Sequence, residues 1–264
     1  MPQIDDHAFS ADLAERAGHL LLTLRAAGGD PDVLRKAGDR QSHEFLMAEL
    51  ARSRPDDAVL SEEGVDDKAR LTADRVWIVD PLDGTREFGE PGRADWAVHV
   101  ALWSRDGAGQ GDLIAGAVGL PAQDRVLSTA APMAYPAGQA GASADRPLRL
   151  VVSRTRASQL VKDVAQLLGA ELVPCGSAGA KAATVVTGEN DVYLHSGGFY
   201  EWDTAAPVAV ARANGFHVSR IDGSPVRYNE ENPLLPDILV CRPAIAAELL
   251  NAIMDAGEGT ANAI

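Results

Sequence analysis

The stretch WIVDPLDGTREF, from Trp77 to Phe88, decides how the sequence is interpreted. It begins with three large apolar residues that are typical of a buried strand, and Asp80 follows directly at their end. Pro81 then favours a turn that returns Asp83 to the side of Asp80. Two carboxylates around a turn add nothing to the stability of a core strand, so the stretch indicates a functional site.

This turn combines ligands for a cation with groups that bind an anion. Hard cations such as Mg²⁺ take oxygen ligands, usually one or two carboxylates with water and phosphate in the remaining positions. Asp80, the carbonyl of Leu82 and Asp83 can supply such oxygens. Gly84 and Thr85 then open a short helix whose free N–H groups would face a bound phosphate. The alternative is an Asp-Pro turn in which Asp83 caps the helix, and the stretch alone leaves both open.

Two further acidic positions lie at the ends of predicted elements. In LSEEG, residues 60–64, an apolar segment leads into Glu62 and Glu63. Their separation from Asp80 along the chain is about that of two strands joined by a hairpin. In EWDTAA, Asp203 lies at the start of an alanine-rich helix, where the alternative is an N-cap. These two stretches favour a cation site over a simple capped turn.

The composition predicts an ordered globular protein. The chain has 264 residues, 46% hydrophobic and 23% charged, which is enough for a sizeable core in one large domain or two modest ones. The formal net charge of -14 repels nucleic acid and anionic lipid, so we expect no nucleic acid and no membrane as partner. Two cysteines, an acidic N-terminal segment and no apolar run of roughly 20 residues lead us to expect a cytoplasmic protein.

Apolar periodicity predicts helices followed by strands in the first half of the chain. One helix runs from Phe9 to the glycine pair at 28–29, with Ser10 as its cap, and a second runs from Asp39 to about Ser53. The predicted strands are residues 76–79, 96–103, 113–120 and 125–129. Because turn residues separate these strands, we expect them to form a largely antiparallel sheet.

Small and polar residues between Ala130 and Pro147 indicate a linker, so we divide the chain into domains 1–140 and 141–264. Strands and helices alternate beyond it, which predicts an α/β layer unit. The predicted strands are 148–152, 171–174, 192–194 and 238–241, and the predicted helices are 157–168, 178–187, 203–213 and one from Pro243.

The order and spacing of these motifs resemble those of a known enzyme family. LSEEG, WIVDPLDGTREF and EWDTAAPVAVARANG follow one another as in the inositol monophosphatase superfamily of lithium-sensitive, magnesium-dependent phosphatases. GSAGAK and ENDVYL fall where the family has a helix and a strand, and VVSRTR, DPLDGTREF and WDTAA are most similar to the CysQ-type 3′-phosphoadenosine 5′-phosphate (PAP) phosphatases. The resemblance implies an α/β (α+β) fold, a layered α-β-α-β-α sandwich with an antiparallel sheet in the first half and a mixed sheet in the second. It also implies a homodimer.

The resemblance implies the residues of the site as well. About two to three Mg²⁺ ions would be bound by Glu62, Asp80, the carbonyl of Leu82, Asp83 and Asp203. Thr85, paired with Asp39, and Glu62 would orient and deprotonate a metal-activated water for in-line attack on the phosphate. The clustered carboxylates would then explain the acidic net charge, because they bind the cations that attract the phosphate.

The neighbouring positions favour a bisphosphorylated nucleotide over an inositol phosphate. Inositol monophosphatases usually have a glutamate that reads sugar hydroxyls where this chain has Ser196, and an asparagine where it has Lys181. The lysine, with one of the arginines after the strand at 148–152, can pair with a second phosphate; the alternative is a solvated surface cation. The predicted substrate contacts are Asp83, Gly84, Thr85, Ser153, Arg154, Arg156, Ser177, Lys181 and Asp203.

We therefore predict a Mg²⁺-dependent 3′(2′),5′-bisphosphate nucleotidase that hydrolyses the small-molecule phosphate ester PAP to AMP and phosphate in sulfate assimilation. The alternatives are an inositol or fructose-1,6-bisphosphatase-like sugar phosphatase and a non-catalytic sensor of cations or phospholigands. We expect Gly197 and Gly198, with Phe199 and Tyr200, to form an ordinary turn with buried aromatics rather than an aromatic wall. The six histidines are expected in ordinary surface or core roles.

Overall fold

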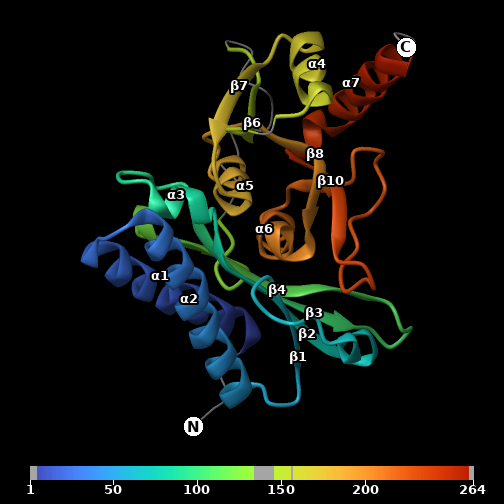
Figure 1. The fold of residues 1–264 in the computed structure, drawn as a ribbon. Coiled ribbons are helices and arrows are strands. Elements are labelled where there is room, and N and C mark those ends of the chain that lie inside the picture. Colours follow the sequence, from blue (N-terminus) through green and yellow to red (C-terminus); the bar gives the residue numbers. More distant parts are fainter. Residues whose placement is uncertain (1–4, 134–145, 156, 262–264) are drawn as a thin grey trace.

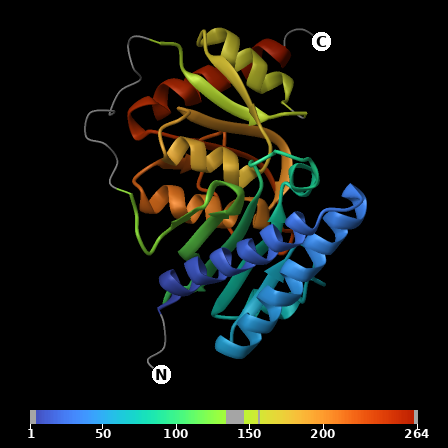
Figure 2. The same ribbon diagram turned by 90° about the vertical axis from the view of Figure 1, so that its left-hand side faces the viewer.

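The computed structural model describes residues 5–133, 146–155 and 157–261, which fold into five layers (Figure 1). Two five-stranded sheets form the second and fourth layers. The helices of the first, third and fifth layers are α1 (Asp6–Ala27) and α2 (Pro31–Ser53), α5 (Ala178–Val186) and α6 (Glu201–Ala213), and α4 (Gln159–Leu167) and α7 (Pro243–Ala261). Figure 2 shows α1 and α2 covering the outer face of the first sheet. The predicted α/β class and α-β-α-β-α layering are confirmed.

Each sheet comes from one half of the chain. The first, in the order β1-β2-β3-β4-β5, contains β1 (Ala58–Ser61), β2 (Arg75–Asp83), β3 (Ala97–Arg105), β4 (Gly111–Leu120) and β5 (Arg125–Ser128). The second, in the order β7-β6-β8-β10-β9, contains β6 (Arg149–Ser153), β7 (Glu171–Cys175), β8 (Val192–Tyr200), β9 (His217–Ser219) and β10 (Leu234–Cys241). The short helix α3 (Thr85–Gly89) follows β2, and two 3-10 helices span Lys68–Thr72 and Pro121–Gln123.

Alternate side chains of the first sheet enter two different hydrophobic cores. Trp77 and Val79 of β2 pack with α1 and α2, whereas Val76 and Ile78 pack with α5 and α6 on the opposite face. A third core lies between the second sheet and the outer helices α4 and α7. Each fully buried valine or isoleucine stabilises the fold by about 1.5–3 kcal/mol. The strand that leads to Asp80 is therefore held on both faces.

The first sheet contains one parallel pair. β1 pairs with β2 in parallel, with Ser61 opposite Val79. The prediction of an antiparallel sheet, with a hairpin return between Glu62 and Asp80, is wrong at this pair. Parallel strands point their carboxyl ends toward the same edge of a sheet. For this reason Glu62, directly after β1, lies beside Asp80 of β2.

Both N-terminal helices begin earlier than predicted. α1 is capped by the side chain of Asp5, so the predicted cap Ser10 lies inside the helix. α2 begins at Pro31, after the cap Asp30, rather than at Asp39. Asp39 therefore has helical turns on both sides, which fix its backbone.

The predicted linker between Ala130 and Pro147 lies largely outside the described residues, and the division into domains 1–140 and 141–264 remains a prediction. The two sheets fall on opposite sides of that segment. They share the core that surrounds α5 and α6. In the described part of the chain, no helix combines the length and the apolar character needed to cross a membrane.

Candidate active site

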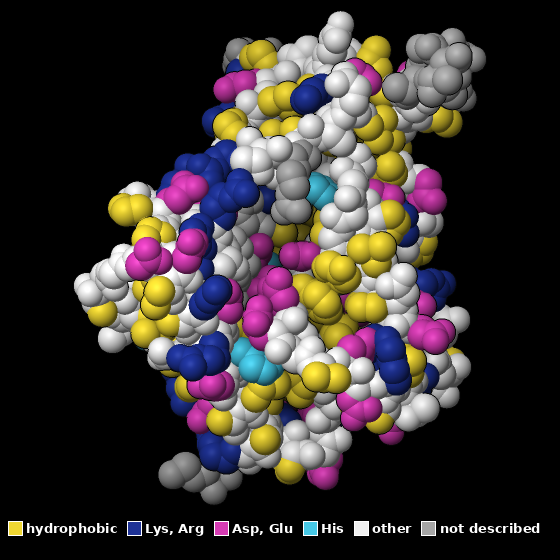
Figure 3. All heavy atoms as spheres, in the orientation of Figure 1, with side chains coloured by type: hydrophobic (Ala, Val, Ile, Leu, Met, Phe, Trp, Pro, Cys, Tyr) yellow, Lys and Arg dark blue, Asp and Glu magenta, His cyan; other side chains and the backbone are white. Residues whose placement is uncertain are grey.

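A cleft of about 890 Å³ lies between the two halves of the chain (Figure 3). One wall is formed by β2 and α3, and the other by residues from β8, α5 and α6. Figure 3 shows acidic side chains at its centre and hydrophobic side chains beside them. The cleft therefore brings together two kinds of surface, one suited to cations and one suited to an apolar ligand group.

The acidic centre contains residues from three distant segments. Asp80 and Asp83 come from β2, and Asp203 comes from the first turn of α6, where its carboxylate accepts the Tyr200 N–H at 2.6 Å. Oxygens of these three aspartates lie within 4.8 Å of one another. The carboxyl group of Glu62 lies next to that of Asp80. The structure thus brings together all four acids that the sequence indicates.

The cluster is electrostatically unfavourable without a cation. Burial and the charges of Asp203 and Asp83 raise the pKa of Glu62 to about 7, and burial and Asp83 raise that of Asp203 to about 6. Burial and the charge of Glu62 raise the pKa of Asp80 well above its usual value. A divalent cation would offset the repulsion that these pKa shifts express.

Asp83 differs from the other acids because it has several donors. Its Oδ2 accepts hydrogen bonds from the Ser177 hydroxyl and from the Gly179 N–H at 2.8 Å, and lies 3.2 Å from His99 Nε2. Burial acts to raise its pKa, but His99, Lys181 and Ser177 together lower it to about 2. Asp83 is therefore a fixed negative charge, held through one of its two oxygens.

The donor set fits a hard divalent cation. Asp80 Oδ1 accepts the Leu82 N–H at 3.0 Å, but Oδ2 is buried and has no hydrogen-bond partner in the described part of the chain. A buried carboxylate oxygen without a partner is costly unless a cation contacts it. Around it lie further carboxylate oxygens, which are the ligands that Mg²⁺ prefers. The carbonyl of Leu82, the predicted backbone ligand, accepts a hydrogen bond from Thr85 at 3.1 Å.

Thr85 and Asp39 meet at the edge of this cluster. Thr85 Oγ1 lies 3.2 Å from Asp39 Oδ1. Burial and the charge of Glu63 raise the pKa of Asp39 to about 6, although the contact with Thr85 lowers it. Gly84, just before Thr85, has a φ of +85°, and a Cβ there would lie 3.1 Å from the Cβ of Ser177. This turn therefore requires glycine, which lets β2 end in α3 against the start of α5.

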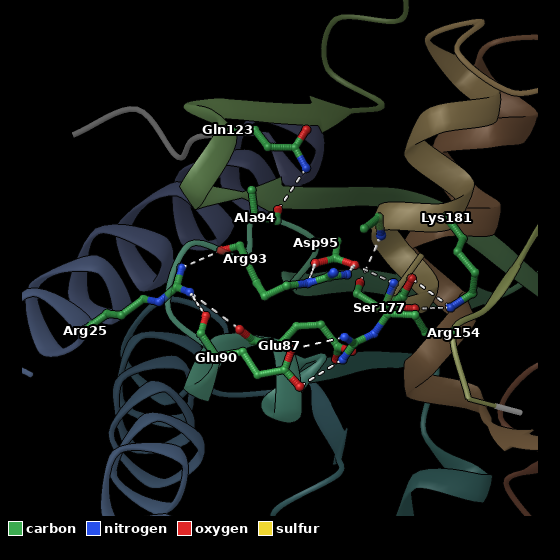
Figure 4. Close-up of polar contacts among 12 residues, drawn as sticks. Arg25, Glu87, Glu90, Arg93, Ala94, Asp95, Gln123, Arg154, Ser177 and Lys181 are labelled. Atoms are coloured by element: carbon green, nitrogen blue, oxygen red, sulfur yellow. Dashed lines mark hydrogen bonds and ion pairs between the residues drawn. The ribbon is translucent and has the colours of Figure 1, made fainter. Parts of the chain in front are cut away.

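Two of the predicted substrate-binding cations have partners inside the protein (Figure 4). Lys181 is 5% exposed, and its ammonium group donates to the carbonyls of Gly176 and Ser177. Arg154 pairs with Glu87 at 2.7 Å and with Glu90 at 2.9 Å, which connects the second half of the chain to α3. Both cations still line the cleft.

Among the other predicted contacts, Ser153 and Ser177 line the cleft, and Arg156 lies outside the described residues. The structure adds Arg86, which was not predicted. Arg86 is exposed in the cleft, and its Nη1 lies 3.5 Å from the hydroxyl of Thr155. Its signal in the sequence was its position directly after Thr85.

Aromatic side chains form a wall of the cleft, contrary to the predicted ordinary turn. Residues 197–200 continue β8, and Phe199 and Tyr200 line the cleft together with His195 and Trp202. Tyr200 is 45% exposed and stacks on Trp202 with ring centroids 4.6 Å apart and an interplanar angle of 11°. Of the histidines, which were expected in ordinary surface or core roles, His99 is completely buried, and its Nε2 lies 3.2 Å from Asp83 Oδ2.

The raised pKa values predict how the metal-free protein responds to pH. A folded protein that binds more protons than the unfolded chain loses stability as pH rises. For Glu62, Asp203 and Asp39 this window runs from about 4, the ordinary carboxyl value, to the raised values of about 6 to 7. Asp83 acts in the opposite sense, but below this window, because its pKa is lowered to about 2. Urea unfolding in EDTA is therefore expected to show a lower midpoint at pH 7.5 than at pH 5.

Saturating Mg²⁺ should remove most of this decrease, because the bound cation takes the place of the protons. Glu201 contributes to the decrease in stability in a way that Mg²⁺ does not reverse. It lies outside the cluster, and burial raises its pKa to about 7. A midpoint of the metal-free protein that stays constant or rises between pH 5 and pH 7.5 would contradict this prediction.

Comparison with known proteins assigns the chain to one family. The inositol monophosphatase family model matches residues 9–257. The chain belongs to this family, whose members are metal-dependent phosphatases. Over 245 residues it is 52% identical to the 3′-phosphoadenosine 5′-phosphate phosphatase of Mycobacterium tuberculosis (strain CDC 1551 / Oshkosh). The aligned region covers 91% of this chain and 90% of that protein.

More distant relatives agree with this assignment. Over 236 residues the chain is 31% identical to the 3′(2′),5′-bisphosphate nucleotidase CysQ of Escherichia coli (strain K12), covering 84% of this chain and 94% of that protein. The crystal structure of CysQ from Bacteroides thetaiotaomicron superposes with a TM-score of 0.75 at 28% identity, covering 89% of this chain and 96% of that one. The predicted family is therefore confirmed.

Proposed function

We propose that the protein is a Mg²⁺-dependent 3′(2′),5′-bisphosphate nucleotidase that hydrolyses PAP to AMP and phosphate. The observation that carries this proposal is a carboxylate cluster with an unpartnered, buried Asp80 oxygen next to a wall of aromatic side chains. The names of the similar proteins from Mycobacterium tuberculosis and Escherichia coli support the same activity.

The carboxylates of the cleft would hold the cations that the reaction needs. The residues proposed as ligands are Glu62, Asp80, the carbonyl of Leu82, Asp83 and Asp203, and they would hold about two to three Mg²⁺ ions. When bound, Mg²⁺ neutralises the phosphate, lowers the pKa of water and stabilises the leaving oxygen. The protein's part is to keep Asp83 ionised and correctly turned, which the donors Ser177 and Gly179 accomplish.

Thr85 and Asp39 would orient the attacking water. The Thr85 hydroxyl has two acceptors within reach, Asp39 at 3.2 Å and the Leu82 carbonyl at 3.1 Å, so its own lone pairs can accept a hydrogen bond from water. Asp39, with a pKa of about 6, can take a proton from that water through Thr85 near neutral pH. Rigid backbones of α2 and α3 hold the pair, so the water is bound in one orientation.

The aromatic wall supports a nucleotide as substrate. Adenine has two flat faces, and stacking of a base on an aromatic side chain contributes about 1–3 kcal/mol. The stacked pair Tyr200 and Trp202 offers such a surface at the side of the acidic cluster. Inositol and fructose phosphates have no flat aromatic face, and they would leave this wall in contact with hydroxyl groups.

A second phosphate group needs a cation, and Arg86 is well placed to supply it. Lys181 donates to two backbone carbonyls and Arg154 pairs with two carboxylates, so most of their donors are already used inside the protein. Arg86 is exposed in the cleft and makes a contact of 3.5 Å with Thr155. We therefore include Arg86 with Ser153, Arg154, Arg156, Ser177 and Lys181 as proposed contacts of the nucleotide.

A substrate panel tests the proposed function. Under the same Mg²⁺ concentration, kcat/KM is measured for PAP, inositol 1-phosphate and fructose 1,6-bisphosphate. Stacking of the adenine and pairing of the second phosphate each contribute more than 1 kcal/mol, so PAP is expected to be preferred by at least about 10-fold. Preference for either sugar ester would overturn the nucleotide assignment, and no turnover of any ester would indicate a non-catalytic sensor. The cytoplasmic location and the homodimer stay predictions.

A further inference from the structure

His99 lies in the middle of β3, opposite Asp80 in the antiparallel register of β2 and β3. Its side chain is completely buried. The imidazole Nδ1 lies 3.0 Å from the carbonyl oxygen of Trp202, which can only accept, so Nδ1 carries a hydrogen and donates. On the other side of the ring, Nε2 lies 3.2 Å from Asp83 Oδ2, and with a hydrogen on both ring nitrogens this contact is an ion pair. One ring thus contacts Asp83 and the residue that precedes Asp203.

The position of His99 on its strand argues against a role in packing alone. Side chains alternate along a strand, so His99 shares a face of β3 with Ala97 and Ala101. Both alanines belong to the apolar core around α5 and α6. A polar ring at such a position costs free energy unless it has polar partners. An apolar side chain would fill this space without that cost, so its polar contacts explain the choice of histidine better than its volume does.

Gly179 in α5 provides an independent sign that the ring position matters. A Cβ at Gly179 would lie 2.1 Å from His99 Nε2, a distance that excludes every other residue unless the ring moves. Gly179 is the second residue of α5. The same glycine donates its N–H to Asp83 Oδ2. The absence of a side chain at Gly179 therefore leaves room for the His99 ring beside Asp83 at the start of α5.

We propose that His99 is a positioning residue that holds the carboxylate of Asp83 and the N-terminal turn of α6, which carries Asp203, at a fixed separation. It joins the two halves of the chain at the cation cluster, because β3 belongs to the first half and α6, which packs between the two sheets, belongs to the second. The inference rests on the proposed cation site, but it does not depend on which phosphate ester is the substrate.

Variants of His99 separate positioning from simple stability. His99→Leu removes both polar contacts. The amide of His99→Asn can occupy the position of Nδ1 but not that of Nε2, whereas the longer side chain of His99→Gln places its amide at the position of Nε2. The remote His217→Gln, in β9, is the matched control. For each variant, Mn²⁺ affinity is measured by electron paramagnetic resonance without substrate, the melting temperature is measured in EDTA, and kcat and KM are measured separately.

Loss of a residue that orients a metal ligand weakens metal affinity by about 10- to 100-fold. His99→Leu is expected to show this loss, with a lower kcat and a smaller change in KM, and His99→Gln is expected to recover part of it. His217→Gln should bind Mn²⁺ as the wild type does. If folded His99→Leu has a lower melting temperature but an unchanged Mn²⁺ affinity, the proposal is wrong. Should His99→Leu not fold, an unchanged affinity of His99→Gln and His99→Asn together would overturn it equally.

Weak Mn²⁺ binding by the wild type itself would instead contradict the proposed cation site. Hydrolysis of a sugar phosphate in place of PAP, with the His99 variants behaving as expected, would contradict only the substrate assignment. The three results are therefore distinguishable.

Discussion

Replacing Asp80 by asparagine is expected to lower kcat by about 10²- to 10³-fold, the range in which removing one group that stabilises a transition state falls. The same change should stabilise the metal-free protein. Asp80 has a pKa well above its usual value because of burial and Glu62, and a neutral amide of the same shape removes that repulsion. An increase in the free energy of unfolding in EDTA is therefore expected.

The opposite signs of these two effects make the Asp80 prediction specific. Activity is measured at saturating Mg²⁺, and stability is measured by urea unfolding in EDTA. Asp74→Asn is a suitable control, because that side chain is 90% exposed and lies just before β2, at the end of the strand away from Asp80 and Asp83. A variant that loses activity and stability together would show that Asp80 is a structural residue rather than part of a cation site.

Removing the hydroxyl of Thr85 by the isosteric change Thr85→Val is expected to lower kcat by about 10²-fold, at the lower end of what proton transfer contributes. Thr85 contacts both Asp39 and the Leu82 carbonyl, so the orientation of the attacking water is lost with it. Thr85→Ser keeps the hydroxyl and should recover most of the activity. Mn²⁺ affinity of Thr85→Val should stay within a few-fold of the wild type, because none of the proposed carboxylate ligands changes.

The pairing of Thr85 with Asp39 is tested by a double-mutant cycle. Residues that act as a unit show non-additive effects, so Thr85→Val combined with Asp39→Asn should be little worse than either change alone. Losses that multiply in the double variant would show that the two side chains act independently and would remove Asp39 from the proposed mechanism.

The acidic residues of the site could be predicted because each follows a recognisable signal. Asp80 and Asp83 frame a proline directly after an apolar run, and Asp203 opens an alanine-rich helix. Asp83 ends β2 and Asp203 lies in the first turn of α6, whereas Asp80 lies inside β2, where the register with β3 shifts. The layered fold followed from the same alternation of apolar strands and helices, together with the resemblance to a family.

The direction of β1 could not be read from the sequence. Its four residues, Ala58 to Ser61, are apolar enough for either orientation, and only the pairing with β2 decides it. The parallel pairing matters, since it places Glu62 beside Asp80 at one edge of the sheet. An antiparallel hairpin would have placed the end of β1 at the opposite edge.

Contacts between the two halves of the chain could not be predicted from the sequence either. The pattern Val98-His99-Val100 shows that the histidine faces away from its neighbours, but it does not show that α5 and α6 cover that face. Lys181 was predicted to face substrate, but its flexible side chain bends back onto carbonyls at the start of its own helix. Such choices depend on tertiary packing, which local spacing does not contain.

Anomalous diffraction from crystals soaked in Mn²⁺ tests the shared cation pocket most directly. Data collected above the manganese edge should show strong anomalous peaks between Asp80, Asp83 and Asp203, with Glu62 in contact with at least one of the ions. Crystals of Asp80→Asn should lose or weaken these peaks under the same soak. If crystals soaked at a saturating Mn²⁺ concentration show no anomalous peak at these carboxylates, or show peaks only elsewhere on the protein, the account is contradicted.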